Sequence, residues 1–302
     1  MPTYRILTFD GGGIRGVYTA VLLQRLSQKV PGFLDRAHLL AGTSTGGILA
    51  LGLASGMTAD QLVKLYQDNG KQIFARSLFR EIGDLGDLIG AKYDNANLQK
   101  ILANVFGSKT LDDLLPRHVL ISSFDLDCPG KQRTWNPKFF HNFKGDDSDG
   151  AEKVVDVALR TSAAPTYFPV YQGYVDGGVV ANNPSMAALA QALDDGTGDQ
   201  EQDDIRLFSV GTGGSPTFIS GDTHNWGIAQ WAHSLVSMMI DGMMGVADYE
   251  CSRVLRDNYF RLAPPLPEPV ALDAVDQIPM LIADANNVNL DSAVSWLQKN
   301  FA

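Results

Sequence analysis

The sequence predicts a three-layer α/β/α fold with a mainly parallel central sheet. The first observation is a repeated order of short apolar segment, glycine-rich turn and helix-like segment, found at 5–26 and again at 38–54. Strands that alternate with helices in this way form parallel sheets covered by helices on both faces. The second observation is that 45% of the 302 residues are hydrophobic, which is enough for a large core. No linker or internal repeat interrupts the sequence, so we expect a single domain over residues 1–302.

The first quarter of the chain contains five predicted elements. Thr58 is a suitable N-cap for the last of them, because its side chain can accept from the first free amides of a helix. The uniformly apolar segment 48–54 fits a buried helix. In chain order the elements are strand 5–9, helix 17–26, strand 38–41, helix 48–54 and helix 59–74.

Residues 75–108 are mixed and punctuated by glycine, which indicates an insertion of short helices, one of them over 97–106. The part from about residue 226 to 302 is predicted to be mainly helical. Between these two parts the sequence predicts strand 119–122, acidic loop 145–150, helix 154–159, strand 173–175, acidic loop 194–204 and strand 206–210.

Charge and composition exclude several classes of function. The chain has 24 basic and 34 acidic residues, a formal net charge of −10, so nucleic acid is not an expected partner. Cys128 and Cys251 are the only cysteines, and neither they nor the histidines form a metal-binding pattern, so we expect no cofactor and no metal. The sequence lacks the apolar run of a signal peptide or of a membrane-spanning helix, which predicts a cytoplasmic protein.

The sequence 42–46, Gly-Thr-Ser-Thr-Gly, matches the G-x-S-x-G nucleophile elbow. In such an elbow a serine lies at a sharp turn between a strand and a helix, and glycines two residues away leave room for the turn. The following helix directs its first amides at the oxygen that becomes negative during acyl transfer. Ser44 is therefore a candidate nucleophile, whereas an ordinary glycine-rich turn is the alternative.

The glycine run 11–13 allows three interpretations. Gly11-x-Gly13-x-x-Gly16 has the spacing of a dinucleotide-binding turn, but the acid that should hold the ribose is missing from the end of the second strand. A tight turn with a solvated Arg15 is the second interpretation. The third is an oxyanion hole, in which unobstructed backbone amides face Ser44. The neighbouring serine elbow favours the oxyanion hole, with Arg15 as a positive charge suited to phosphate or carboxylate.

A serine nucleophile needs a group that accepts its proton. None of the histidines after Ser44 lies in a recognisable strand end or glycine turn, and His233 fits a helix. Asp176, which follows a predicted strand and precedes two glycines, is the better candidate, although Asp-Gly is also common in simple turns. An aspartate acts as a base near neutral pH only if burial raises its pKa.

The motifs occur in one order: 10–16, then 42–46, then Asp176-Gly177-Gly178 followed by Asn182-Asn183-Pro184. A further segment, 161–169, reads TSAAPTYFP. Together they resemble the patatin-like phospholipases, a family of lipid acyl hydrolases. The resemblance covers about residues 4–215, is looser through Arg261, and leaves the insertion near 75–108 and the tail beyond about 265 unmatched.

The resemblance implies a Ser–Asp dyad without a catalytic histidine, on a three-layer sheet related to that of animal cytosolic phospholipase A. It implies that Ser44 is the nucleophile and Asp176 its partner, and that Arg15 supports the glycine loop or binds substrate phosphate. The implied oxyanion hole consists of the amides of Gly11, Gly12 and Gly13.

The function expected from this resemblance is hydrolysis of glycerolipid acyl esters, of phospholipase A or lysophospholipase type, on membranes or micelles. A general carboxylesterase or thioesterase acting on soluble esters is the alternative enzyme. A lipid- or nucleotide-binding module without catalysis is the alternative outside enzymes. Met238, Met239, Met243 and Met244 belong to a methionine-rich stretch that fits either a buried helix, which we favour, or a mobile lid or membrane-contacting surface.

Overall fold

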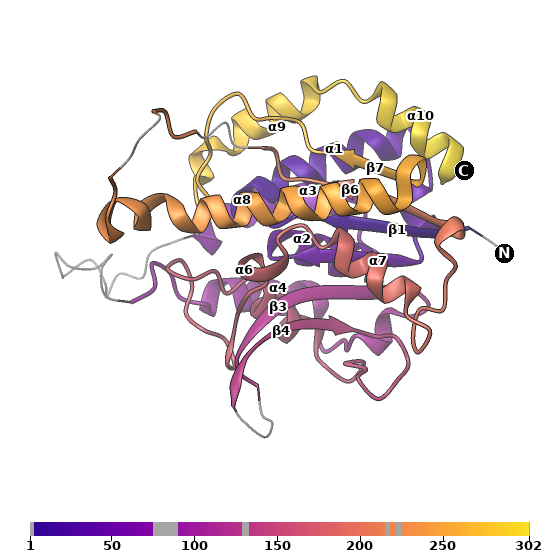
Figure 1. Cartoon of the computed structure of the whole chain (residues 1–302), viewed down its shortest axis with the longest axis horizontal. Helices are drawn as coiled ribbons and strands as arrows, with labels where there is room; N and C mark the ends of the chain where they lie inside the picture. Colours follow the sequence, from indigo (N-terminus) through magenta and orange to yellow (C-terminus); the bar gives the residue numbers. More distant parts are fainter. Residues whose placement is uncertain (1–2, 75–89, 129–132, 215–217, 222–224, 302) are drawn as a thin grey trace.

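The computed structural model describes residues 3–74, 90–128, 133–214, 218–221 and 225–301. Within these residues the strands form one seven-stranded sheet in the order β4-β3-β2-β1-β6-β7, and β5 also pairs with β3 (Figure 1). All neighbouring strands are parallel except β4 and β5, which run antiparallel to β3. The strands are β1 (Tyr4–Phe9), β2 (Leu39–Thr43), β3 (His118–Cys128), β4 (Thr134–His141), β5 (Tyr174–Asp176), β6 (Ile205–Val210) and β7 (Tyr259–Leu262).

Helices cover both faces of this sheet, which confirms the three-layer α/β/α prediction. Alternate residues of a strand point to opposite faces. On β1, Leu7 and Phe9 pack into a large core together with α1, α2, α3, α4, α5, α9 and α10, whereas Tyr4 and Ile6 pack into a second core with α7 and α8. The helices are α1 (Gly16–Lys29), α2 (Thr45–Ala54), α3 (Ala59–Ile73), α4 (Ala96–Phe106), α5 (Val154–Thr161), α6 (Gly178–Ala181), α7 (Ser185–Leu193), α8 (Ile228–Leu255), α9 (Ile278–Asn287) and α10 (Asp291–Asn300).

The predicted elements outside the insertion appear at the expected places. Thr58 caps α3 as predicted, since its hydroxyl accepts from the Gln61 amide and the Gln61 side chain accepts from the Thr58 amide. The helix expected over 97–106 is α4. The rest of the insertion, at 75–89, lies outside the described residues.

Two strands were not predicted from the sequence. The first four residues of β4 are exposed, and the fourth of them is Pro137. β4 tolerates a proline because it is an edge strand, whose outer side forms no hydrogen bonds with another strand. β7 has only four residues and follows the 28-residue helix α8. β4 and β7 are strands because they pair with β3 and β6, and the local sequence pattern does not reveal such pairing.

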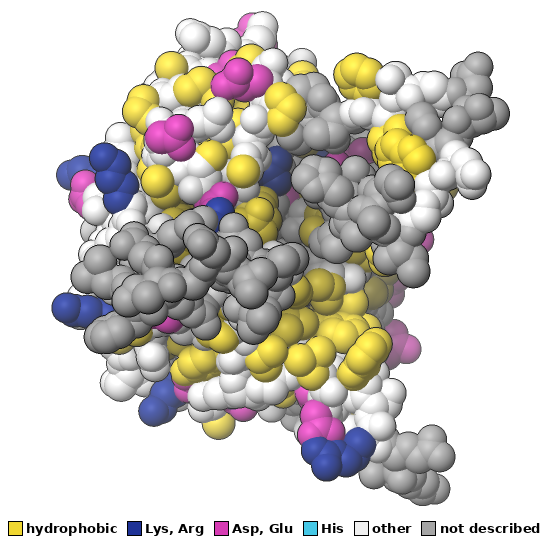
Figure 2. All heavy atoms as spheres, turned by 90° about the vertical axis from the view of Figure 1, so that its left-hand side faces the viewer, with side chains coloured by type: hydrophobic (Ala, Val, Ile, Leu, Met, Phe, Trp, Pro, Cys, Tyr) yellow, Lys and Arg dark blue, Asp and Glu magenta, His cyan; other side chains and the backbone are white. Residues whose placement is uncertain are grey.

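The burial expected for the methionine-rich stretch is wrong at two positions. The stretch is helical, but Met238 and Met239 on α8 are 46% and 55% exposed. Figure 2 faces the end of the molecule at which α8 begins, and it shows hydrophobic side chains gathered into a broad area on this face. No helix in the described part of the chain is long and apolar enough to span a membrane.

The parallel strands bring three loops to one edge of the sheet. β1 ends before the glycine run 11–13, β2 ends before Ser44, and β6 ends before Gly211 and Thr212. Because β1 pairs in parallel with both β2 and β6, these carboxyl ends lie side by side. Ligand and catalytic sites of open α/β sheets lie at this edge.

Candidate active site

Ser44 occupies a strained backbone position between β2 and α2. Its φ of 54° and ψ of −123° lie in a region of backbone conformation that residues other than glycine rarely adopt. The flanking glycines allow the turn. A Cβ on Gly42 would lie 2.1 Å from the Gly46 carbonyl oxygen, and a Cβ on Gly46 would lie 2.2 Å from the Phe9 carbonyl oxygen. The pattern G-x-S-x-G is therefore a steric requirement of this turn.

The backbone amide of Ser44 is held by a side chain from another part of the sequence. It donates to Thr161 Oγ1 at 2.8 Å, and the same hydroxyl donates to the Ser122 carbonyl oxygen at 2.6 Å. Thr161 is fully buried at the end of α5. Sequence reasoning did not assign a role to this threonine, although it lies in the segment 161–169 that supports the family resemblance.

Asp176 meets Ser44 at this edge of the sheet. β5 pairs with β3 so that Asp176 lies opposite Ser123, and Ser122 lies opposite Thr43 on β2. The Asp176 carboxylate lies near enough to Ser44 for the serine hydroxyl to lower its pKa, and it accepts a hydrogen bond from the Gly178 amide at 2.7 Å.

Burial controls the basicity of this carboxylate. Asp176 is only 5% exposed, and the loss of solvation raises its pKa to about 6, while its bonds to Ser44 and Gly178 oppose the rise. A carboxylate of this pKa is ionised at pH 7 and is a much stronger base than an exposed aspartate. The arrangement can take a proton from Ser44 without a histidine.

The glycine loop lies against Ser44. A Cβ added to Gly11 would be 3.4 Å from the Cβ of Ser44. The Gly11 amide donates a hydrogen bond to the Asn182 carbonyl at 3.0 Å. It therefore has an internal acceptor in this structure, whereas the sequence predicted that this amide would be an oxyanion donor. The amides of Gly12 and Gly13 have no hydrogen-bond partner among the described residues.

The Arg15 side chain supports the glycine loop through hydrogen bonds to two backbone carbonyls. Its Nε donates to the Gly12 carbonyl and its Nη1 to the Gly213 carbonyl, each at 3.3 Å. Burial lowers the pKa of Arg15, and the charges of Asp241 and Asp10 oppose that effect. Of the two roles that the resemblance implied, these contacts correspond to support of the loop.

A buried ion pair anchors the start of the glycine loop. Arg261 on β7 contacts both carboxylate oxygens of Asp10, at 2.9 and 2.5 Å, and also donates to Ser209 Oγ at 2.7 Å. Asp10 is 1% exposed, and burial raises its pKa against the opposing effect of Arg261. The sequence did not single out Arg261 for this role, since its partner lies 251 residues away.

The histidines with described side chains lie away from this edge. His118 begins β3, four residues before Ser122, which corresponds to about 13 Å along a strand. His141 pairs with Leu120, and His38 precedes β2. None of the three is at the carboxyl end of β1 or β2, where Ser44 lies.

The described residues contain no group of three or more His, Cys, Asp or Glu side chains that could hold a metal ion. The acid nearest in sequence to the glycine loop on its carboxyl side, Asp35, precedes β2 and forms an ion pair with Arg117 at 2.6 Å. The ribose contact required by the dinucleotide interpretation is therefore not supplied by Asp35.

Helix α8 reaches the site through Met244. The Asn182 side-chain amide donates to Met244 Sδ at 3.0 Å, and the Asn183 side-chain amide donates to the Met244 carbonyl at 3.5 Å. Asn182 Nδ2 also lies 3.4 Å from the Gly11 carbonyl oxygen. The exposed methionines of α8 thus belong to a helix that contacts the residues around the glycine loop.

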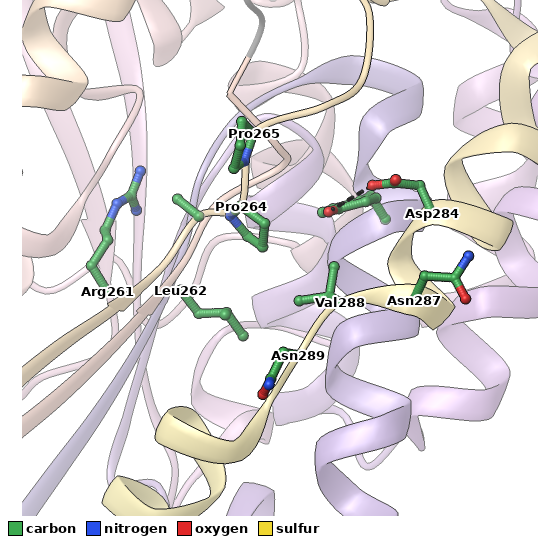
Figure 3. A pocket seen from close by; sticks show the side chains of 10 residues that line it. Arg261, Leu262, Pro264, Pro265, Asp284, Asn287, Val288 and Asn289 are labelled. Carbon is green, nitrogen blue, oxygen red and sulfur yellow. Dashed lines mark hydrogen bonds between the residues drawn. The ribbon is translucent and has the colours of Figure 1, made fainter.

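A pocket of about 510 Å³ lies behind the ion pair, between β7, α1 and α9 (Figure 3). Tyr18 donates to Asp284 across it at 3.1 Å. Arg261 lines this pocket, but Ser44 and Asp176 do not. A second pocket, of about 320 Å³, lies between β3 and β4 beside Trp135, also away from Ser44.

Comparison with known proteins is consistent with the geometry described above. The family model for patatin-like phospholipase matches residues 7–189. CotR of Bacillus subtilis is 33% identical over 100% of this chain and 99% of its own length. A cGAMP-activated phospholipase of Pseudomonas aeruginosa is 34% identical over 87% of this chain and 78% of its own length. Patatin-like protein 2 of Oryza sativa is 31% identical over 75% of this chain and 65% of its own length.

Solved structures with detectable similarity include two bacterial proteins. VipD from Legionella pneumophila has a TM-score of 0.44 at 14% identity, over 94% of this chain and 67% of its own. The type III effector protein ExoU has a TM-score of 0.40 at 13% identity, over 99% of this chain and 54% of its own.

Proposed function

Because this chain belongs to the patatin-like phospholipase family, we propose that it is a serine lipid acyl hydrolase that uses Ser44 and Asp176 as a catalytic dyad. One observation carries the proposal: Ser44, at a strained strand-to-helix turn, lies beside the buried carboxylate of Asp176, whose pKa is raised to about 6. A strained serine paired with a base is the arrangement of an activated nucleophile. The substrate class is a glycerolipid acyl ester, as in phospholipase A or lysophospholipase reactions.

In the proposed reaction Ser44 Oγ bonds to the ester carbonyl carbon while its proton moves to Asp176. The carbonyl oxygen becomes an oxyanion, which the amides of Gly12 and Gly13 and the first amides of α2 stabilise. The tetrahedral intermediate then collapses, and the leaving alcohol takes the proton from Asp176. Water attacks the acyl-enzyme with Asp176 again as base, which releases the fatty acid and returns the proton to Ser44.

Labelling with a fluorophosphonate probe tests the dyad. We expect a single covalent adduct on Ser44, found by peptide mass spectrometry, and none in Ser44→Ala. Ser55→Ala is the matched control, because Ser55 ends the same helix and its buried hydroxyl has no hydrogen-bond partner. A folded wild-type protein that takes no label, with or without lipid vesicles, would favour a binding module instead of an enzyme.

Activity on two physical forms of substrate separates the two enzyme hypotheses. A lipid acyl hydrolase is expected to hydrolyse phospholipid in mixed micelles faster than a short-chain ester dissolved as monomers. A carboxylesterase or thioesterase would prefer the dissolved ester and gain nothing from micelles. Ser44→Ala should abolish either activity.

A further inference from the structure

The segment 161–163 contacts both members of the proposed dyad. Thr161 Oγ1 accepts the Ser44 amide at 2.8 Å, and the Ala163 carbonyl accepts the Asp176 amide at 3.0 Å. Thr161, the last residue of α5, and Ala163, two residues further on, thus bind the backbone amides of the proposed nucleophile and of its proposed base.

The side-chain contact of Thr161 is the more informative of the two. Ser44 departs from ordinary backbone geometry, and such strain persists only where surrounding contacts maintain it. Thr161 is fully buried, and its hydroxyl joins the Ser44 amide to the Ser122 carbonyl of β3. The threonine methyl is also packed, since a Cβ on Gly47 would lie 2.9 Å from Thr161 Cγ2.

From these contacts we infer that Thr161 is a positioning residue for catalysis. The Thr161 hydroxyl holds the Ser44 backbone in the conformation that directs the Ser44 hydroxyl at Asp176. The inference rests on the proposed function and adds a residue that does not touch the substrate. Without the Thr161 hydroxyl the Ser44 amide loses its acceptor, and an unpaired amide in this partly buried turn favours rearrangement of the turn.

Two substitutions at one position isolate the hydroxyl. Thr161→Ser and Thr161→Ala both remove the methyl group, and they differ from each other only in the oxygen. Ser162→Ala is the matched control, because Ser162 is the adjacent residue and its buried hydroxyl has no hydrogen-bond partner.

We expect Thr161→Ala to lower the rate of fluorophosphonate labelling of Ser44, and kcat on a soluble ester, by at least tenfold, with KM within twofold of wild type. Thr161→Ser should keep both rates within about threefold, and Ser162→Ala should match wild type. A loss caused by the missing methyl group would appear equally in Thr161→Ser and Thr161→Ala. Equal labelling rates in folded Thr161→Ala and Thr161→Ser would overturn the inference.

Amide hydrogen exchange at Ser44 separates this inference from the proposed function. The Ser44 amide should be protected in the wild type and in Thr161→Ser and should exchange faster in Thr161→Ala. If Thr161→Ala does not fold, Thr161→Val replaces it, since valine has the shape of threonine without the hydroxyl. If the wild type takes no label, the proposed function fails, and the exchange rates still decide whether Thr161 holds the turn. Unchanged exchange without the hydroxyl would refute that role.

Discussion

The Gly11 amide donates a hydrogen bond to the Asn182 carbonyl, with 3.0 Å between nitrogen and oxygen. Asn182 follows Asp176 by six residues, so this bond ties the glycine loop to the segment that carries the carboxylate. The Asn182 side chain adds a longer contact, 3.4 Å, to the Gly11 carbonyl. The Gly11 amide thus anchors the glycine loop to Asn182, and the proposed oxyanion donors are the amides of Gly12 and Gly13.

The pH dependence of activity should report Asp176. The base acts only when ionised, and its pKa is about 6, so kcat/KM on a soluble ester should fall about tenfold per pH unit below pH 6 and level off above it. Initial rates between pH 4.5 and 8 measure this. A midpoint near pH 4 would contradict the effect of burial. A midpoint that disappears after chemical modification of histidines would assign the base to a histidine.

Asp176→Asn should stabilise the protein at neutral pH while it removes activity. A carboxyl group with a folded pKa of about 6 and an ordinary value of 3.8 disfavours the folded state by about 3 kcal/mol once both states are ionised. The folded state binds this proton more tightly, so the contribution of Asp176 to stability falls as pH rises from about 4 to above 6. Asparagine stays neutral throughout this range.

Denaturant unfolding of both proteins at several pH values measures this difference. The excess stability of Asp176→Asn should be small at pH 4 and should grow to its full size by pH 7. An excess that stays constant with pH would mean that burial of the charge is not its cause.

Gly12→Ala should reduce turnover by about 100-fold, the loss typical of a displaced oxyanion donor. Its new Cβ would lie 2.3 Å from Thr212 Oγ1, and Thr212 donates to the Gly11 carbonyl at 2.9 Å. The clash therefore moves the loop. Gly245→Ala on α8 is the control, since nothing lies within 4 Å of its added Cβ, and it should keep wild-type kcat. Wild-type turnover in Gly12→Ala would exclude the loop from catalysis.

Arg261→Gln should lower the free energy of unfolding by about 3–5 kcal/mol, because it leaves the carboxylate of Asp10 buried without its partner. Asp10→Asn combined with Arg261→Gln removes both charges and should recover part of that loss. The matched control is Arg133→Gln: Arg133 is paired with Asp127, but its side chain is 75% exposed, and the expected cost is below about 1 kcal/mol. Equal losses in Arg261→Gln and Arg133→Gln would contradict the role of burial.

Local patterns were sufficient for most of the fold. Apolar segments followed by glycine turns predicted β1, β2 and β6 and the helices after the first two, because a parallel strand buried on both faces is continuously apolar. The same reasoning missed β4 and β7, whose residues become strands through their neighbours. It also favoured burial for Met238 and Met239, since helical spacing does not tell whether another element covers the apolar face.

The sequence by itself determined the family and predicted the residues proposed for acyl hydrolysis: Ser44 between glycines, Asp176 before glycines and the glycine run, in the order typical of that family. Only the tertiary structure decided what surrounds them. The burial that raises the pKa of Asp176, the Thr161 hydroxyl on the Ser44 amide and the Arg261 contact with Asp10 each join parts of the chain far apart in sequence. Spacing along a chain records local geometry, whereas desolvation and long-range hydrogen bonds exist only after the chain has folded.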